Sequence, residues 1–302
     1  MSDAAVSQRV PEGALGRLWS KLEAHGSLIK SKQTLLLLAT GLAGYLSARP
    51  ESGTSLGARL MTLALFSAVS GTTALNMVFD RDIDARMVRT ARRPLPSGTL
   101  SAREAARFGG VLVAAGLALA FWLSRPFGWV IAAGVGLDLC VYTLWLKRRT
   151  PWSIVFGGVS GGMPILAGRT LGTGGVDGLG LLLALSVLLW IPAHILTFAM
   201  KHADDYRLGG VPTWPAVHGF DSTRRFIAVS NALRAVSLVA AGWWLGICPW
   251  SLSLLAVSGV VTVCLSVRAV LRPSAQLNLL LFKLASLHML ASMVLLTLGA
   301  VF

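Results

Sequence analysis

The chain has 302 residues, of which 54% are hydrophobic and only 13% are charged, and its formal net charge is +14. Soluble globular domains carry about 25% charged residues, so this composition excludes an ordinary soluble protein and favours a membrane protein. The basic excess does not require nucleic acid as a partner, because membrane proteins concentrate Lys and Arg on their cytoplasmic side.

The N-terminal segment, residues 1–32, is polar and mixed, and we expect it to be a cytoplasmic tail. Within it, the stretch LGRLWSKL (Leu15 to Leu22) fits a short amphipathic helix at the membrane interface as well as it fits a solvated tail. We expect the remainder, residues 33–302, to form a single transmembrane domain.

Beyond residue 32, apolar runs long enough to cross a bilayer as helices recur along the chain. The runs are continuous and do not alternate with polar residues, which favours helices over a closed barrel. The expected fold is therefore all-α, with nine transmembrane helices. Their predicted ranges are 33–48, 57–81, 107–124, 127–147, 153–171, 179–200, 226–246, 251–271 and 278–301.

The basic residues are distributed unevenly between the two sides of this predicted bundle. With the N-terminus on one side, nearly all Lys and Arg residues fall on that same side. The exceptions are Arg49, Arg59, Arg125 and Arg169. The positive-inside rule then predicts a multi-pass protein of the cell membrane, with its N-terminus in the cytoplasm and its C-terminus outside.

A charged cluster follows the second predicted helix, in NMVFDRDIDARMVRTARRPL. Asn76, Asp80 and Asp84 are spaced four residues apart, so they form a column on one helix face. Their oxygens suit Mg²⁺, which leaves further positions for substrate phosphate, and arginine forks bind phosphate. The cluster therefore favours a metal–diphosphate site over interfacial salt bridges. The arginines are Arg81, Arg86, Arg89, Arg92 and Arg93.

A second cluster closes the sixth predicted helix, in KHADDYRLGGVPTWP. Adjacent side chains on a helix point about 100° apart, so Asp204 and Asp205 are not equivalent ligands. We expect both to lie near a second Mg²⁺, with neither clearly the better ligand, and Lys201 to contact the substrate. Helix-end salt bridges remain the alternative.

Two polar positions fall inside predicted spans. Asp138 is an intramembrane acid, which either contacts a substrate or is a buried hydrogen-bonded group. Tyr142 follows it on the same face, and Lys147 at the cytoplasmic end could neutralise a leaving phosphate. His194 follows Pro192 in a helix that we expect to kink, and it is either a packed polar residue or a ligand.

These residues resemble a known family. The stretch from Asn76 to Leu95 resembles the first aspartate-rich motif of the UbiA superfamily of intramembrane prenyltransferases. The stretches YTLWLKRRTP, GGVSGGMP and DDYRLGGVPTWP are similar to the haem O synthase branch of that superfamily, and the likeness extends from about Lys30 onward. The segment IPAHI, Thr213 and Arg169 depart from the usual pattern of that branch.

The resemblance implies a helical bundle around a central cavity that opens to the lipid bilayer. It further implies an isoprenoid diphosphate donor, farnesyl diphosphate for this branch, bound through Mg²⁺, and haem B as the acceptor. The positions that match the family's metal ligands are Asn76, Asp80, Asp84, Asp204 and Asp205. Those that match positions near the diphosphate are Arg89, Arg93, Tyr142 and Lys147.

Two other functions remain open at this point. The first is prenyl transfer to an aromatic quinone precursor or to a glycerol phosphate lipid. The second is membrane transport. The two acidic clusters lie on the same side and four predicted helices apart, which hints at two similar halves, and paired half-repeats occur in transporters. The clustering of the acidic residues at one membrane face argues against a transporter, whose binding sites usually lie near the midplane.

Overall fold

The computed structural model describes residues 14–29, 31–49 and 54–301, and every regular element in these ranges is a helix. The predicted all-α fold is thus confirmed. Helix α1 (Ala14–Leu28) contains the predicted amphipathic stretch. Its position at the membrane interface stays a prediction, and most of the predicted tail, residues 1–13, lies outside the described ranges.

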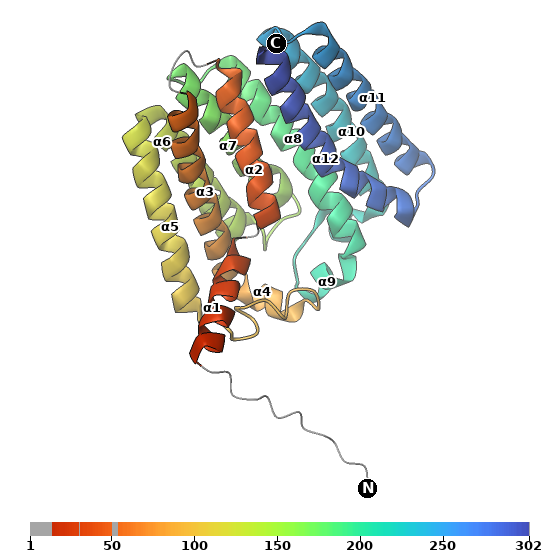
Figure 1. The fold of residues 1–302 in the computed structure, drawn as a ribbon. Helices are drawn as coiled ribbons and strands as arrows, with labels where there is room; N and C mark the ends of the chain where they lie inside the picture. Colours follow the sequence, from red (N-terminus) through yellow and green to blue (C-terminus); the bar gives the residue numbers. More distant parts are fainter. Residues whose placement is uncertain (1–13, 30, 50–53, 302) are drawn as a thin grey trace.

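Long helices run side by side through the molecule, and α1 lies at one end with two short helices, α4 (Arg81–Arg86) and α9 (Ala203–Leu208) (Figure 1). The last residues of α12 lie at the opposite end (Figure 1). The long helices are α2 (Ser31–Ser47), α3 (Thr54–Phe79), α5 (Ala102–Leu123), α6 (Arg125–Gly136), α7 (Ser153–Thr173), α8 (Gly178–Lys201), α10 (Trp214–Leu245), α11 (Pro249–Leu271) and α12 (Ala275–Val301).

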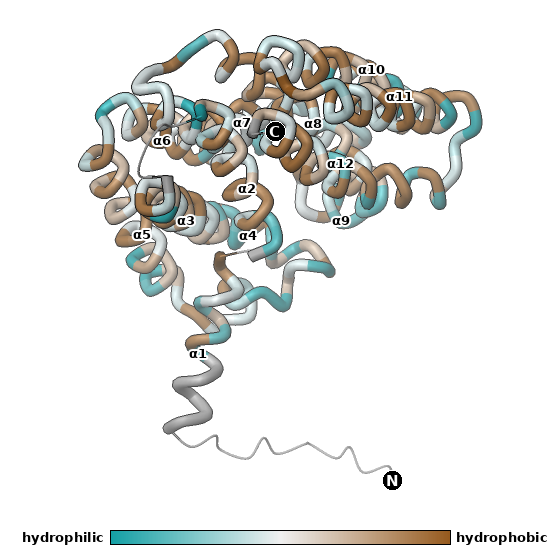
Figure 2. Tube along the Cα trace, turned by 45° about the horizontal axis from the view of Figure 1, so that its top comes forward, coloured by the Kyte–Doolittle hydropathy of each residue, from teal (hydrophilic) through white to brown (hydrophobic). Residues whose placement is uncertain are grey.

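Eight helical segments in the described part of the chain are long and apolar enough to cross a membrane. Hydrophobic residues run along these helices, whereas hydrophilic ones gather in loops and near α4 (Figure 2). Helix α2 has 17 residues and packs in the bundle, but it is shorter than those eight segments. The membrane bundle is confirmed, whereas the predicted count of nine spans is not.

Small residues allow α2 and α7 to cross closely. A Cβ atom on Gly44 would lie 2.1 Å from the carbonyl oxygen of Ile165, and one on Gly168 would lie 1.9 Å from that of Gly41. Glycine is therefore required at both positions, because no side chain fits between the two backbones. In the stretch GGVSGG, a Cβ on Gly162 would lie 2.7 Å from the Ala184 carbonyl oxygen, so α7 also packs closely against α8.

Helix α10 begins at Trp214, well before the predicted start at residue 226. The predicted start is wrong because polar residues around 218–225 interrupt the apolar run, although the chain is already helical there. Pro215 in the first turn favours helix initiation, since its missing N–H would have no partner there. Gly219, at φ 76° and ψ 170°, then kinks the helix, so the chain turns before it enters the bundle.

The predicted α-helix 127–147 is in fact two helical segments of different kinds. Helix α6 ends at Gly136, and the chain continues as a π-helix, η1 (Leu137–Leu146). The hydrogen bonding between residues five apart, which defines a π-helix, continues to its end, where the backbone N–H of Lys147 donates to the carbonyl oxygen of Tyr142 at 2.8 Å. π-Helical segments are rare and are frequently found at functional sites, and the sequence periodicity did not predict this one.

Arg169 ties together three helices at the end of the bundle opposite α4. Its guanidinium donates to both carboxylate oxygens of Asp177, at 2.6–2.9 Å, and to the backbone carbonyl of Ser47 at 3.1 Å. Asp177 also accepts a hydrogen bond from the N–H of Gly180 and so caps α8. This contact explains Arg169, which departs from the pattern of the resembled branch, as a structural residue.

Replacing Arg169 by leucine should destabilise the fold by about 1–3 kcal/mol, because the replacement leaves hydrogen-bonding groups of α2 and Asp177 unpaired. The hydrogen bond from Arg169 lowers the pKa of Asp177. A lowered folded-state pKa means that the stabilisation is present above the unfolded pKa and is lost as pH falls through the folded value.

Thermal unfolding of the two chains measures this effect, and the difference in Tm should shrink below about pH 4. Arg125→Leu is a suitable control, because Arg125 is an exposed arginine without an ion pair among the described residues. A loss of Tm at pH 7 no larger than that of the control would contradict the structural role.

Candidate active site

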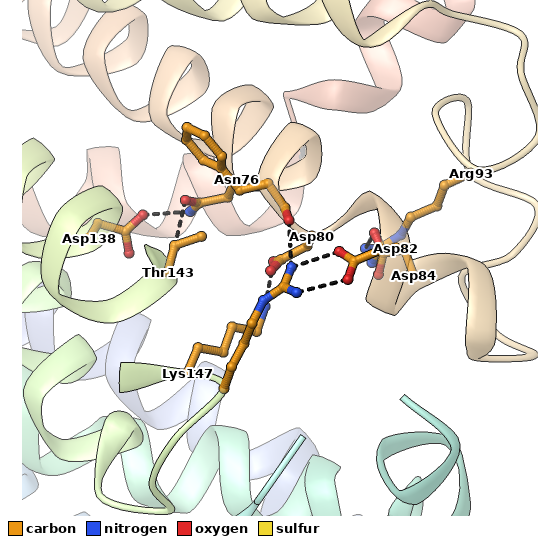
Figure 3. Close-up of polar contacts among 10 residues, drawn as sticks. Asn76, Asp80, Asp82, Asp84, Arg93, Asp138, Thr143 and Lys147 are labelled. Carbon is orange, nitrogen blue, oxygen red and sulfur yellow. Dashed lines mark hydrogen bonds and ion pairs between the residues drawn. The ribbon is translucent and has the colours of Figure 1, made fainter. Parts of the chain in front are cut away.

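The predicted column of polar residues is present at the junction of α3 and α4 (Figure 3). The helix is interrupted at Asp80, yet its hydrogen-bond ladder continues across the interruption. The N–H of Asp80 donates to the carbonyl of Asn76 at 2.9 Å, and that of Asp84 to the carbonyl of Asp80 at 2.8 Å. Asn76, Asp80 and Asp84 therefore keep the helical spacing that places them on one face.

Each carboxylate of this segment is paired with a cation from elsewhere in the chain. Asp80 pairs with Lys147, and Asp84 accepts a hydrogen bond from Arg93 at 2.7 Å. Both acids are buried, with 7% and 6% of their surfaces exposed. The site thus holds two desolvated carboxylates beside two cations, an arrangement that can exchange partners when a charged ligand binds.

Asp82 points away from the column, as its spacing predicts, and binds Arg148 through two hydrogen bonds of 2.6 and 2.7 Å. These hydrogen bonds lower the pKa of Asp82 and raise that of Arg148. Arg148 also donates to the backbone carbonyl of Phe79 at 2.7 Å. Asp82 thus pairs with an arginine, and Arg148 anchors the end of α3 to the segment after η1.

The chemistry of the column fits a hard divalent cation. Asp80 Oδ1 is buried and has no hydrogen-bond partner among the described residues, so it leaves an acceptor for another group. Within those same residues, no three His, Cys, Asp or Glu side chains form a group that could hold a metal by themselves. A cation bound here would therefore need oxygen ligands from a substrate as well, as Mg²⁺ at phosphate sites usually does.

Lys147 lies between Asp80 and the ring of Tyr142, whose centroid is 5.6 Å from the Lys147 Nζ. Burial alone would lower the pKa of Lys147, but the neighbouring Tyr142 and Asp80 raise it overall. The amine is therefore held as an ammonium ion at neutral pH. A buried ammonium group beside the carboxylates can stabilise negative charge on a phosphate leaving group.

A hydrogen-bonded network joins the column to η1 and α7. Asn76 Nδ2 donates to Asp138 Oδ2 at 2.5 Å, and the Thr143 hydroxyl donates to Asn76 Oδ1 at 2.8 Å (Figure 3). The Ser160 hydroxyl donates to Asp138 Oδ1 at 3.2 Å. Sequence reasoning missed Thr143 and Ser160, although a hydroxyl in a span close to an intramembrane acid is a usable signal.

A cavity of about 730 Å³ opens beside this network. Its walls come from α2, α3, α6, η1, α7, α8 and α12, and they are mostly apolar. Such a volume lies within the usual range of about 300–1,000 Å³ for small-molecule and cofactor sites. Of the predicted site residues, Asn76, Asp138, Tyr142 and His194 line it.

The second charged cluster separates its two aspartates. The side chain of Asp205 is 14% exposed and accepts a hydrogen bond from the N–H of Val88 at 3.1 Å. Arg89 lies 4.0 Å from the same carboxylate and covers the ring of Phe198 at 5.0 Å. Asp205 therefore faces the part of the first motif that follows α4.

Asp204 and Lys201 lie outside this arrangement. The side chain of Asp204 is 90% exposed, and its ion-pair partner is Arg207, at 3.5 Å. Lys201 is exposed at the end of α8. The structure thus separates Asp205 from Asp204, which sequence spacing alone could not do, and it does not bring Asp204 or Lys201 to the column.

Comparison with known proteins identifies the family of the chain. Residues 37–290 match the model of the UbiA prenyltransferase family. Two similar curated relatives are both named protoheme IX farnesyltransferase. The one from Archaeoglobus fulgidus is 43% identical over 73% of this chain and 77% of its own, and the one from Korarchaeum cryptofilum is 42% identical over 69% and 70%.

Solved structures share the fold at lower identity. A digeranylgeranylglyceryl phosphate synthase aligns with a TM-score of 0.76 at 21% identity, over 93% of this chain and 99% of its own. A UbiA homologue from Archaeoglobus fulgidus bound to GPP and Mg²⁺ aligns with a TM-score of 0.70 at 16% identity, over 91% and 99%. With the family match and the sequence relatives, these findings establish that the chain belongs to the UbiA prenyltransferase family.

Proposed function

We propose that this prenyltransferase transfers a farnesyl group from farnesyl diphosphate to a vinyl group of haem B, giving haem O. The observation that carries the proposal is the identity of 42–43% to relatives named protoheme IX farnesyltransferase. A large apolar cavity beside a charged cluster supports it, because one substrate is an apolar isoprenoid chain with a charged diphosphate and the other is a large apolar ring system.

The donor diphosphate would bind at the column of Asn76, Asp80 and Asp84, with Asp205 on the facing segment. These residues would hold Mg²⁺, which the GPP-bound Archaeoglobus homologue also contains. Bound Mg²⁺ would neutralise charge on the diphosphate as it leaves. Arg93, whose guanidinium already lies 2.7 Å from Asp84, is placed to bind the phosphate oxygens bidentately.

The reaction would begin when the bond between C1 of the farnesyl chain and the diphosphate oxygen breaks. The electron pair leaves with the diphosphate, and Lys147, Arg89 and Arg93 stabilise that charge. The allylic cation remains in the cavity, whose apolar walls limit capture by water. Tyr142 and Asp138 line the same cavity, close to the charged end.

The acceptor step would use the π electrons of the haem vinyl group. They attack C1 of the allylic cation and form the new carbon–carbon bond, which leaves a cation on the vinyl carbon next to the ring. One water molecule adds its oxygen there and releases a proton, giving the hydroxyethylfarnesyl group. Farnesyl diphosphate, haem B and water thus become haem O, diphosphate and one proton.

The two aspartates of the second cluster should respond differently to mutation. Asp205→Ala should lower turnover about 10²-fold or more, because a desolvated carboxylate of the diphosphate site is lost. Asp204→Ala, its matched neighbour, should have a much smaller effect, because that side chain is 90% exposed and points away. Steady-state rates at saturating Mg²⁺ measure both, and equal losses in the two variants would contradict the placement.

A competition between acceptors tests the proposed function. Purified protein receives Mg²⁺, farnesyl diphosphate, haem B and 4-hydroxybenzoate together, and mass spectrometry identifies the products. We expect the haem adduct alone. Prenylation of only the aromatic acid, or of neither compound, would reject the haem acceptor while leaving the family membership in place.

We further propose that the chain lies in the cell membrane with α4 and α9 on the cytoplasmic side. The basic residues at that end support this orientation through the positive-inside rule. A reporter fused after the last residue should therefore be detected outside the cytoplasm. A cytoplasmic signal from the C-terminal fusion, with an N-terminal fusion as the comparison, would contradict the orientation.

A further inference from the structure

His194 occupies a distinctive place in the central cavity. It lies on α8, two residues after Pro192, and it is the one histidine among the described residues that line the cavity. The imidazole therefore faces the space that the acceptor would occupy. None of the steps derived above for the reaction uses this side chain.

The ring of His194 is held in one orientation by its neighbours. Trp190 stacks on one side with a centroid distance of 4.8 Å and an interplanar angle of 18°, and Phe282 stacks with 5.1 Å and 19°. Two aromatic contacts on nearly parallel rings fix the plane of the imidazole. A histidine that only filled space would not need its plane to be defined in this way.

The two ring nitrogens of His194 have different surroundings. Nδ1 lies 3.1 Å from the hydroxyl of Ser286 on α12, whereas Nε2 makes no hydrogen bond to any described residue. When Nδ1–H donates to Ser286, Nε2 carries a free lone pair. Metal-binding histidines typically show this pattern, in which a hydrogen bond at one nitrogen fixes the tautomer and the other nitrogen binds the metal.

His288 on α12 differs from His194 in its position and not in its hydrogen bonding, because its Nδ1 likewise has no partner among the described residues. It is 7% exposed, and its Nε2 lies 3.2 Å from the hydroxyl of Ser258. It does not line the central cavity. His288 is thus a packed polar residue, whereas His194 presents an oriented nitrogen to a space large enough for a macrocycle.

From these contacts we infer that His194 Nε2 is an axial ligand of the iron in the acceptor porphyrin. The inference rests on the proposed function, because it takes haem B as the acceptor. Imidazole is a common axial ligand of haem iron. A bond between α8 and the iron would fix the macrocycle in the cavity, so the vinyl groups on its rim would meet the allylic cation in a defined geometry.

Porphyrins with and without iron separate this role from simple packing. Ferric haem B and metal-free protoporphyrin IX are titrated into the purified full chain, and binding is followed by absorbance and fluorescence. In His194→Ala, ferric haem should bind about tenfold or more weakly with a shifted Soret band, as expected when a metal ligand is lost. The metal-free porphyrin should bind as it does to the unaltered chain.

Two more variants complete the design. Ser286→Ala should weaken ferric haem binding by a smaller factor, because it removes only the hydrogen bond that orients the ring. His218→Ala, in which an exposed histidine outside the cavity is removed, should match the unaltered chain.

The outcomes distinguish the inference from the proposed function. Equal ferric haem affinity and spectra in His194→Ala and the unaltered chain would overturn the inference and leave the function standing. Equal loss of both porphyrins in His194→Ala would also overturn it, because that result indicates packing. If the unaltered chain bound neither porphyrin, both the haem acceptor and the iron ligand would be rejected.

Discussion

Replacing Asp80 by alanine should abolish prenyl transfer, with residual turnover at least about 10²- to 10³-fold below that of the unaltered chain. Asp80 is one of the two buried acids of the column, with one oxygen paired to Lys147 and the other without a partner among the described residues. Its loss would remove the group that we expect to hold Mg²⁺ against the diphosphate. Product formation from farnesyl diphosphate measures the effect, and Asp84→Ala should behave in the same way.

Loss of folding could mimic this result, because Asp80→Ala leaves the ammonium group of Lys147 unpaired. Breaking a buried ion pair costs about 3–5 kcal/mol, and Lys147 is only 17% exposed. The double variant Asp80→Ala/Lys147→Met should regain much of the lost Tm but no activity. Full activity in Asp80→Asn, which keeps the shape and loses the charge, would contradict the site assignment.

Chelation of Mg²⁺ by EDTA should stop product formation, and added Mg²⁺ in excess should restore it. Without the metal, Asp80 and Asp84 would place buried negative charge beside the diphosphate and repel it. Lys147 and Arg93 are already paired to these carboxylates, so they cannot compensate fully. Turnover that continued unchanged in EDTA would remove the metal from the proposed mechanism.

Local spacing carried the correct predictions about the site. Asn76, Asp80 and Asp84 follow one another at four-residue intervals, and this spacing survives because the helical hydrogen bonds continue through the interruption at Asp80. The outward direction of Asp82 follows from the same periodicity. Such features depend on neighbours within one or two turns, which the sequence shows directly.

Contacts between distant segments could not be predicted in this way. The pairing of Asp138 with Asn76 joins residues from two helices that are far apart in the sequence, and the choice of Asp205 over Asp204 depends on where α9 docks. The bond of Arg169 to Asp177 was missed for a different reason. A basic residue in an apolar run looks like a departure from the pattern until the turn that follows brings an acid to it.

The π-helix η1 restricts how far the length of the chain can change between residues 137 and 146. Asp138 at its start bonds to Asn76 on α3, and Lys147 directly after its end bonds to Asp80, the first residue beyond α3, so both ends are fastened to the same short segment. Each π-turn spans one residue more than an α-turn. Deletion of a single residue here would move one of these two contacts out of register with the segment that holds them. Loops elsewhere can accommodate insertions and deletions. Within η1, by contrast, substitutions should be tolerated far better than insertions or deletions.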